Sequence, residues 1–366
     1  MFAVSRFFCQ ERIFLKEIYA LRKCSSQGKK ALRSDSKKIF KALINGDRGS
    51  LARGITLVES THIDDIGEAN KLLGCVLQYL KTPSKNNKQT FRIGLTGAPG
   101  AGKSSLIETF GKKLTKEGHK VAVLAIDPSS VKTGGSLLGD RTRMTELARD
   151  PNAFIRPSPA SGTLGGVARK TNEALVLCEG AGYNIILIET VGIGQSEFAV
   201  KDMVDMFVLV IPPAAGDELQ GIKKGIVEMA DLVLVNKADG DLKPAAKRIQ
   251  AEYTSALKLL QRPSDVWRPR VYPVSALYNE GFEKVWWKMQ QFREVMIKNE
   301  TFHQKRKQQY NAWMWNYIED NIMQSFVSNN SVKLELKKYE KMVENGEITP
   351  YMAADALLKI FNTDRS

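Results

Sequence analysis

The residues best suited to chemistry lie in a glycine-rich stretch that begins at Gly97. The apolar run FRIGLT leads directly into GAPGAGKSS, and an amphipathic helical pattern follows and ends near Gly118. Strand, glycine-rich loop and helix in this order are typical of a phosphate-binding loop. The glycines let backbone N–H groups converge on phosphate oxygens, and the helix N-terminus adds partial positive charge. The expected nucleotide ligands in the loop are Gly97, Ala98, Pro99, Gly100, Ala101, Gly102, Lys103, Ser104 and Ser105.

Lys103 and Ser104 give this loop its chemistry. A lysine here neutralises the β- and γ-phosphates, and the hydroxyl that follows it ligates Mg²⁺. Because Mg²⁺ takes oxygen ligands, further carboxylates are expected at the ends of neighbouring strands. Asp127 closes KVAVLAID, Glu189 closes NIILIET, and Asp140 stands in the glycine-rich segment KTGGSLLGDRTRM. We predict a catalytic set of Lys103, Asp127, Asp140 and Glu189, and a magnesium set of Ser104, Asp127, Asp140 and Glu189.

A second motif is suited to reading a purine base. It follows the apolar run LVLV and comprises Asn236, Lys237 and Asp239. The Asp239 carboxylate would accept two hydrogen bonds from guanine, whereas adenine has no ring donor there and would leave a buried charge unpaired. Asn236 is expected to tie this segment to the phosphate-binding loop. The backbone after the run VYPV, at Ser275, Ala276 and Leu277, could contact the guanine carbonyl. The pattern predicts GTP as the nucleotide.

The segment ETVGIGQSE has the form of the acidic-x-x-Gly segment of GTPases. The N–H of its glycine, Gly192, is expected to meet the γ-phosphate. In small GTPases a water-positioning Gln directly follows this glycine. Here Ile193 follows it, and Gln195 lies three positions after the glycine. We therefore predict slow intrinsic hydrolysis of GTP to GDP and phosphate, with a partner protein completing the site.

These motifs require a sheet that brings several strand ends together. Short apolar runs alternate with helical patterns over residues 91–275, namely FRIGLT, KVAVLAID, NIILIET, MFVLVI, LVLVNK and VYPVSA. Runs of this composition are buried on both faces, as in a parallel sheet covered by helices. We predict the α/β class, with a mostly parallel P-loop NTPase sheet. Helical periodicity precedes it over 38–45, 47–59 and 64–80, and residues 81–90 form a polar linker.

Composition is that of a globular protein with a sizeable core, since 43% of the 366 residues are hydrophobic. No apolar run reaches the roughly 20 residues of a membrane span.

The net charge is +14, and the first 38 residues contain ten Lys and Arg residues but only three acidic ones. This basic, aromatic-containing leader resembles a mitochondrial transit peptide, and a native amphipathic helix or a basic arm is the alternative. The basic excess elsewhere is mild, so no nucleic-acid partner is expected.

Six segments together resemble one family closely. They are INGDRGSLARGITLVES, GLTGAPGAGKSSLIE, LAIDPSSVKTGGSLLGDRTRM, IETVGIGQSE, IPPAAGDELQGIKKGIVEMAD and LVNKADGD. Over about residues 38–365 the chain resembles the methylmalonic aciduria type A, MeaB and ArgK-like family of P-loop GTPases. The resemblance implies a GTP- and Mg²⁺-dependent G-protein chaperone of adenosylcobalamin-dependent methylmalonyl-CoA mutase. Such a chaperone gates cofactor loading and protects or reactivates the mutase in the mitochondrial matrix.

The resemblance also implies a coupling loop and a homodimer. The matching loop is 212–224, with Lys223 as its ionic contact to the mutase, and an exposed, solvated lysine is the alternative. Aromatic residues crowd the C-terminal region, including Trp286, Trp287, Trp313 and Trp315. Helix faces rich in aromatic residues occur where two chains meet in a dimer. Packing of these helices on the chain's own domain is the alternative explanation.

The predicted organisation is therefore a leader (1–37), an N-terminal helical extension (38–82), a GTPase domain (91–280) and a C-terminal helical dimerisation region (281–366). Two other functions compete with the chaperone. A P-loop kinase would need a substrate base and a lid that excludes water, and no such constellation stands out. A nickel- or cobalt-insertion GTPase would carry His-rich or Cys-based tracts, whereas this chain has three scattered His and four Cys.

Overall fold

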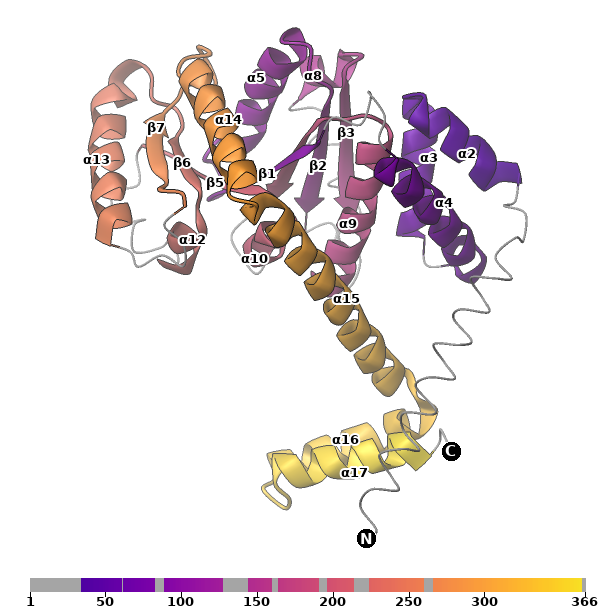
Figure 1. Cartoon of the computed structure of the whole chain (residues 1–366). Helices are drawn as coiled ribbons and strands as arrows, with labels where there is room; N and C mark the ends of the chain where they lie inside the picture. Colours follow the sequence, from indigo (N-terminus) through magenta and orange to yellow (C-terminus); the bar gives the residue numbers. More distant parts are fainter. Residues whose placement is uncertain are drawn as a thin grey trace.

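A computed structural model describes residues 34–60, 62–82, 89–127, 144–159, 164–190, 196–213, 224–259 and 266–363. Within them one seven-stranded sheet has the order β3-β2-β4-β1-β5-β6-β7, and all neighbouring strands are parallel (Figure 1). The strands are β1 Phe91–Thr96, β2 Val121–Asp127, β3 Ala153–Pro159, β4 Ile185–Thr190, β5 Met206–Ile211, β6 Leu232–Val235 and β7 Arg270–Pro273. The predicted α/β class with a parallel sheet is confirmed.

Strand β3 was not predicted from the sequence. Its sequence AFIRPSP contains Pro157 and Pro159, which lack the N–H donor of a ladder and argue against a central strand. The structure places β3 at the edge of the sheet, where it pairs with β2 alone. Proline is tolerated at such edges. Five of the other six strands were predicted within two residues of their bounds, and the run VYPVSA extends three residues past the end of β7.

Alternate residues of the central strands enter two cores, one on each face of the sheet. On β5, Phe207 and Leu209 join one core, and Met206 and Val208 join the other. The first core is covered by α2 Ser34–Ile44, α3 Arg48–Glu59, α4 Ile63–Lys81, α9 Leu164–Gly180, α10 Ser196–Lys201, α12 Lys224–Met229 and α13 Lys243–Leu259, which the turn η1 Gly240–Leu242 precedes. The second is covered by α5 Lys103–Lys116, α8 Thr145–Arg149 and α14 Phe282–Lys298. The sheet is thus buried on both faces.

Helix α14 completes the second core. Phe282 stacks on Phe110 of α5 with ring centroids 5.8 Å apart, and Phe292 stacks on Phe91 of β1 at 6.4 Å. Trp286 lies between them and is buried. The hydrophobic core therefore runs without a break across the boundary expected at residues 280 and 281.

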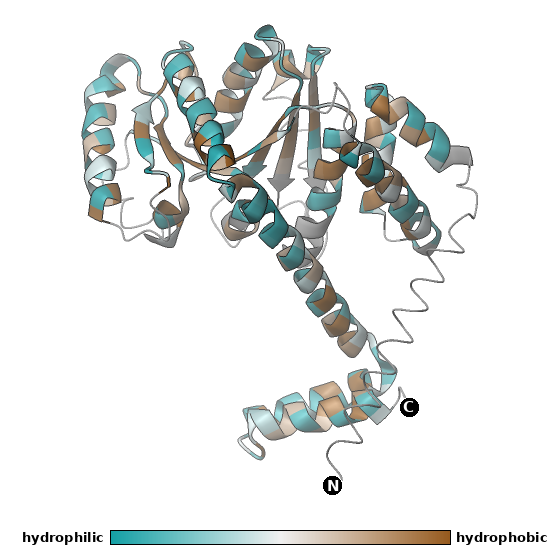
Figure 2. Cartoon of the chain, viewed as in Figure 1, coloured by the Kyte–Doolittle hydropathy of each residue, from teal (hydrophilic) through white to brown (hydrophobic). Residues whose placement is uncertain are grey.

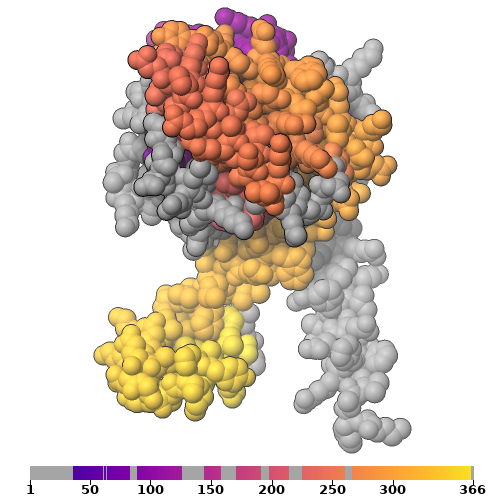
Figure 3. Space-filling model, turned by 90° about the vertical axis from the view of Figure 1, so that its left-hand side faces the viewer, coloured from indigo at the N-terminus to yellow at the C-terminus, as the bar shows by residue number. Residues whose placement is uncertain are grey.

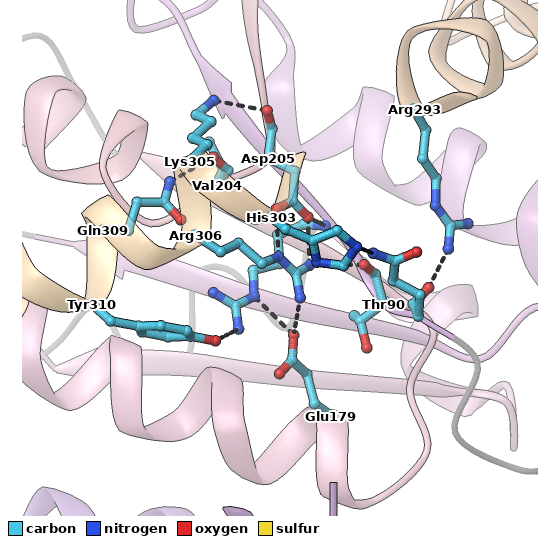
Figure 4. A network of polar contacts seen from close by, with 12 residues as sticks. Thr90, Glu179, Val204, Asp205, Arg293, His303, Lys305, Arg306, Gln309 and Tyr310 are labelled. Carbon is cyan, nitrogen blue, oxygen red and sulfur yellow. Dashed lines mark hydrogen bonds and ion pairs between the residues drawn. The ribbon is translucent and has the colours of Figure 1, made fainter. Parts of the chain in front are cut away.

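Helix α15 Thr301–Ser328 is anchored to the sheet by ionic contacts (Figure 4). Arg306 bonds to Asp205 at the start of β5 and to the backbone oxygen of Thr90 before β1. Arg92 of β1 is fully buried and bonds to Glu179 of α9 at 2.8 Å. Each buried charge faces an opposite one, as a buried ion network requires. The first half of α15 is thus fixed to the amino ends of β1 and β5.

The second half of α15 leaves the body and carries a separate two-helix hairpin, α16 Asn330–Glu344 and α17 Pro350–Thr363 (Figures 1 and 3). We call residues 314–363 the arm. Its own core contains three buried side chains, Val332, Leu357 and Phe361. Figure 2 shows hydrophobic residues along the exposed part of α15. No helix within the described residues is long and apolar enough to cross a membrane.

Candidate nucleotide-binding site

The loop that begins at Gly97 leaves β1 in the middle of the sheet. Gly97 has a φ of +154°, and a Cβ there would lie 2.0 Å from the backbone oxygen of Val210 in β5. Only glycine fits this close approach. Gly100 and Gly102 have φ values of +81° and +82°, in the left-handed region that L side chains rarely adopt. This curl of the main chain lies directly before α5, where converging N–H groups could bind phosphate oxygens.

Asn236 ties the base-reading segment to this loop, as the sequence analysis expected. Its amide nitrogen donates to the backbone oxygens of Ala101 at 2.9 Å and Gly102 at 3.2 Å. A Cβ on Gly102 would lie 2.5 Å from that nitrogen. Asn236 is buried, so its hydrogen bonds are shielded from water. The two segments, 134 positions apart, form one unit.

Lys103 and Ser104 are the first residues of α5. The Lys103 ammonium group donates to the backbone oxygens of Gly97 at 2.7 Å and Ala98 at 3.2 Å, which holds it inside the curl. The Ser104 hydroxyl donates to Oε1 of Glu189 at 2.9 Å. Glu189 is buried on β4, beside β1. A serine oxygen and a carboxylate at this place form the kind of oxygen donor set that Mg²⁺ takes, so the residues fit the ion.

The residues expected to read the base also lie together. The Ser275 hydroxyl donates to Oδ2 of Asp239 and accepts from the backbone N–H of Tyr278 at 3.1 Å. The backbone N–H of Ala276 donates to Oδ1 of Asn236 at 3.3 Å. Lys237 adopts a φ of +59°, an uncommon conformation for a residue other than glycine. The chain after β6 and the chain after β7 are therefore joined by hydrogen bonds.

Two supporting residues were not anticipated from the sequence. The Thr109 hydroxyl of α5 donates to the backbone oxygen of Ala276 at 2.8 Å, which links the phosphate side of the pocket to the base side. The Thr190 hydroxyl donates to that of Thr96 at 3.1 Å, and both side chains are fully buried. Thr109 lies outside the motifs, and Thr190 lies within the ETVG segment but had no role assigned to it from the sequence. The sequence offered one signal for the Thr96–Thr190 contact: each threonine is the last residue of a strand, and the two strands were expected to be parallel.

Some predicted site residues are not located by the structure. Asp140, Gly192 and Lys223 lie outside the described residues, as do residues 1–33 of the leader and 83–88 of the linker. The backbone of Asp127 ends β2 next to β4, at the edge of the sheet where the loop emerges. Within the described ranges no group of three or more His, Cys, Asp or Glu side chains could hold a metal ion. Leu277 is present on the base side and is 77% exposed.

A parallel sheet, a phosphate-binding loop at its centre and a joined NKxD segment define the class of P-loop GTPases. A model of the family described as "Methylmalonyl Co-A mutase-associated GTPase MeaB" matches residues 51–331. The chain belongs to this family of GTPases. It is therefore an enzyme that hydrolyses GTP.

Individual relatives agree with this assignment. The chain is 56% identical over 329 residues to the mouse "Methylmalonic aciduria type A homolog, mitochondrial", covering 89% of this chain and 79% of the relative. It is 41% identical over 324 residues to the "GTPase ArgK" of Escherichia coli, and the match covers 88% of this chain and 96% of the relative. A solved structure titled "LAO/AO transport system kinase" has a TM-score of 0.73 at 34% identity and covers 90% of this chain and 98% of that one.

Proposed function

We propose that GTP binds with its phosphates in the curl at 97–105 and its guanine between Asp239 and the backbone of 275–277. The observation that supports this arrangement is the contact of Asn236 with both regions at once. Ser104, Glu189, Asp127 and Asp140 are the proposed ligands of Mg²⁺, which when bound would neutralise charge on the β- and γ-phosphates. Gly192 is the proposed contact of the γ-phosphate.

Hydrolysis proceeds by attack of water on the γ-phosphorus, with cleavage of its bond to the oxygen shared with the β-phosphorus. Charge then collects on the leaving GDP. Lys103 stabilises that charge from the floor of the loop, and the N-terminus of α5 adds its dipole. Few groups in the proposed site could orient the water, because Ile193 stands where small GTPases have Gln. The isolated chain is therefore a slow GTPase, and a partner accelerates it.

The proposed partner is methylmalonyl-CoA mutase, an adenosylcobalamin enzyme. Membership of a family described as mutase-associated GTPases supports this partner. In this proposal the GTP state and the GDP state bind the mutase differently, and the difference gates cofactor loading and protects the enzyme. The loop 212–224, with Lys223, carries the nucleotide state to the mutase. Animal relatives named mitochondrial support a site of action in the mitochondrial matrix, reached with residues 1–37 as transit peptide.

The proposed assembly is a homodimer joined through the arm. Its hairpin has too small a core to be stable by itself, since three buried side chains cannot offset the ordering of two helices. Large apolar side chains are exposed along it, including Trp315, Met323, Leu334 and Tyr351. Contiguous apolar surface of this kind marks a face that another chain covers. The C-terminal region 281–366 thus supplies both the last core helix and the dimer contact.

A capture experiment tests the chaperone function. Purified chain, lacking residues 1–37 and loaded with a non-hydrolysable GTP analogue or with GDP, is mixed with mitochondrial extract and recovered. We expect the mutase to be captured in a nucleotide-dependent manner. The Lys223→Ala variant should bind nucleotide normally and capture less mutase, while the control Lys337→Ala on α16 should behave as the unchanged chain. Recovery of no corrinoid enzyme in either nucleotide state would contradict the proposed partner.

A further inference from the structure

A cavity of about 410 Å³ lies between α4, α9, α10 and α15, and the nucleotide site does not use it. It is lined by residues that precede β5, so it lies at the amino end of the sheet, whereas the phosphate-binding loop leaves the carboxyl end. In Figure 1, α15 runs past α9 and α10. The volume falls in the range of small-molecule sites, roughly 300–1,000 Å³.

The cavity contains a buried acceptor that lacks a partner within the described part of the chain. Asn172 of α9 lines it, and the side chain is 7% exposed. Its Oδ1 accepts no hydrogen bond from the described residues. A buried polar atom without a partner is unfavourable, so such atoms are rare in folded proteins. A ligand that donates a hydrogen bond would remove this cost.

The charged side chains that line the cavity are both acidic, although the Arg92 guanidinium lies behind the wall, 5.8 Å from the centre of the Trp313 ring. Glu173 and Asp202 line it, and none of its lining residues is Lys or Arg. Lys201 and Lys305 lie close enough to Asp202 to favour its charged form, whereas partial burial raises the pKa of this carboxyl. The Lys305 ammonium group donates to the backbone oxygen of Asp205. The lining therefore favours a cationic ligand and disfavours phosphates and carboxylates.

The remaining wall is apolar and is held in place. Trp313 donates its indole N–H to the backbone oxygen of Asp202 at 2.8 Å, and its ring packs edge-on against Tyr310 with centroids 5.1 Å apart. Leu73 of α4 and Met203 complete the wall opposite. A wall fixed in this way loses little conformational entropy when a ligand binds. It suits an aliphatic or aromatic body.

We propose that this cavity binds a small organic amine, with its ammonium group donating to Oδ1 of Asn172 near the carboxylates of Glu173 and Asp202, and its apolar body against Trp313. The site is separate from the GTP site and is not required for GTP hydrolysis. It gives the chain a second ligand, of opposite charge to the nucleotide.

Three probes of equal length test the proposal on the full chain with GDP bound. They are 3-phenylpropylamine, 3-phenylpropan-1-ol and 3-phenylpropionate, titrated by calorimetry and by the fluorescence of the tryptophans. We expect the amine to bind about tenfold or more tightly than the alcohol, and the carboxylate not to bind. Equal binding of the three, or no binding of the amine at millimolar concentration, would overturn the proposal.

Variants locate the bound amine. Asn172→Leu removes the acceptor and fills its place, and should weaken binding of the amine by about tenfold or more. Asp202→Asn changes a partly buried carboxylate at the rim, leaves the core intact, and should weaken binding of the amine but not of the alcohol. The control Asn321→Leu lies on an exposed part of α15 and should change neither. Unchanged amine binding in both N172L and D202N would refute the site.

Discussion

Arg306 and Asp205 form a two-pronged ion pair that joins the C-terminal helices to the sheet. The Arg306 Nε donates to Oδ1 of Asp205 and its Nη2 donates to Oδ2, both at 2.7 Å. Asp205 is almost fully buried and also accepts from the backbone N–H of Arg92 at 2.8 Å. The first half of α15 thus contacts the amino end of β1, and the phosphate-binding loop follows the carboxyl end of the same strand.

The first prediction concerns the stability of this junction. Asp205→Asn keeps the shape of the side chain and removes the charge that Arg306 faces. We expect a loss of about 3 kcal/mol, the lower end of the range for broken buried pairs, because Glu179 still faces Arg306 at 3.6 Å. Urea unfolding measures the change. The control Asp355→Asn, in a solvent-exposed pair on α17, should leave the midpoint nearly unchanged, and an equal effect of the two variants would contradict the account.

The second prediction is the pH dependence of the same pair. Burial alone would raise the pKa of Asp205, but the charges of Arg306 and Arg92 and their hydrogen bonds hold it below its usual value. Since the folded-state pKa is depressed, the stabilisation is complete above the unfolded-state pKa of about 3.9 and is lost as pH falls through the folded-state value. The stability difference between the unchanged chain and D205N should therefore shrink as the pH falls below about 4. A stability difference that stays constant from pH 7 down to the lowest pH at which both chains remain folded would refute this prediction.

The third prediction compares two glycines. Gly97→Ala places a methyl group against the Val210 oxygen and should abolish nucleotide binding, because the loop must move. Gly67→Ala on α4 meets no heavy atom within 4 Å and should stabilise the fold by about 0.5–1 kcal/mol. Calorimetry with GDP and thermal unfolding distinguish the two effects. If G97A bound GDP as well as G67A does, the close approach of loop and β5 would not matter for binding.

The fourth prediction addresses the dimer. Trp315→Glu combined with Met323→Glu places charges on exposed apolar positions of α15 and should convert a dimer into a monomer in light scattering at micromolar concentration. Trp287→Glu on α14 is the matched control, since Trp287 is similarly exposed but lies away from the arm. A monomeric unchanged chain would contradict the proposed assembly.

Several parts of the fold were predictable because local signals agreed with the final packing. Largely apolar runs marked β1, β4 and β5, which are buried along their whole length. The glycines of the loop, and Asn236 after β6, were recognisable because their chemistry requires particular residues at fixed spacing. The position of α5 followed from the same motif.

Other features could not be derived from local pattern. Strand β3 carries two prolines, and its edge position is known only once the sheet order is known. Arg92 interrupts an apolar strand, and nothing nearby in sequence indicates that Glu179 is its partner. The four C-terminal tryptophans looked alike in sequence, yet Trp286 is buried in the core while Trp287 and Trp315 are exposed. Such differences depend on tertiary contacts between distant segments.

The most direct test of the central claim is calorimetry of guanine, adenine and xanthine nucleotides in the presence of Mg²⁺. We predict that GTP and GDP bind and that adenine nucleotides bind at least about a thousandfold more weakly, because the Asp239 carboxylate would be left unpaired. Asp239→Asn exchanges an acceptor for a donor and should shift the preference to xanthine nucleotides. ATP binding as tight as GTP, or a D239N variant that still prefers guanine, would contradict the account.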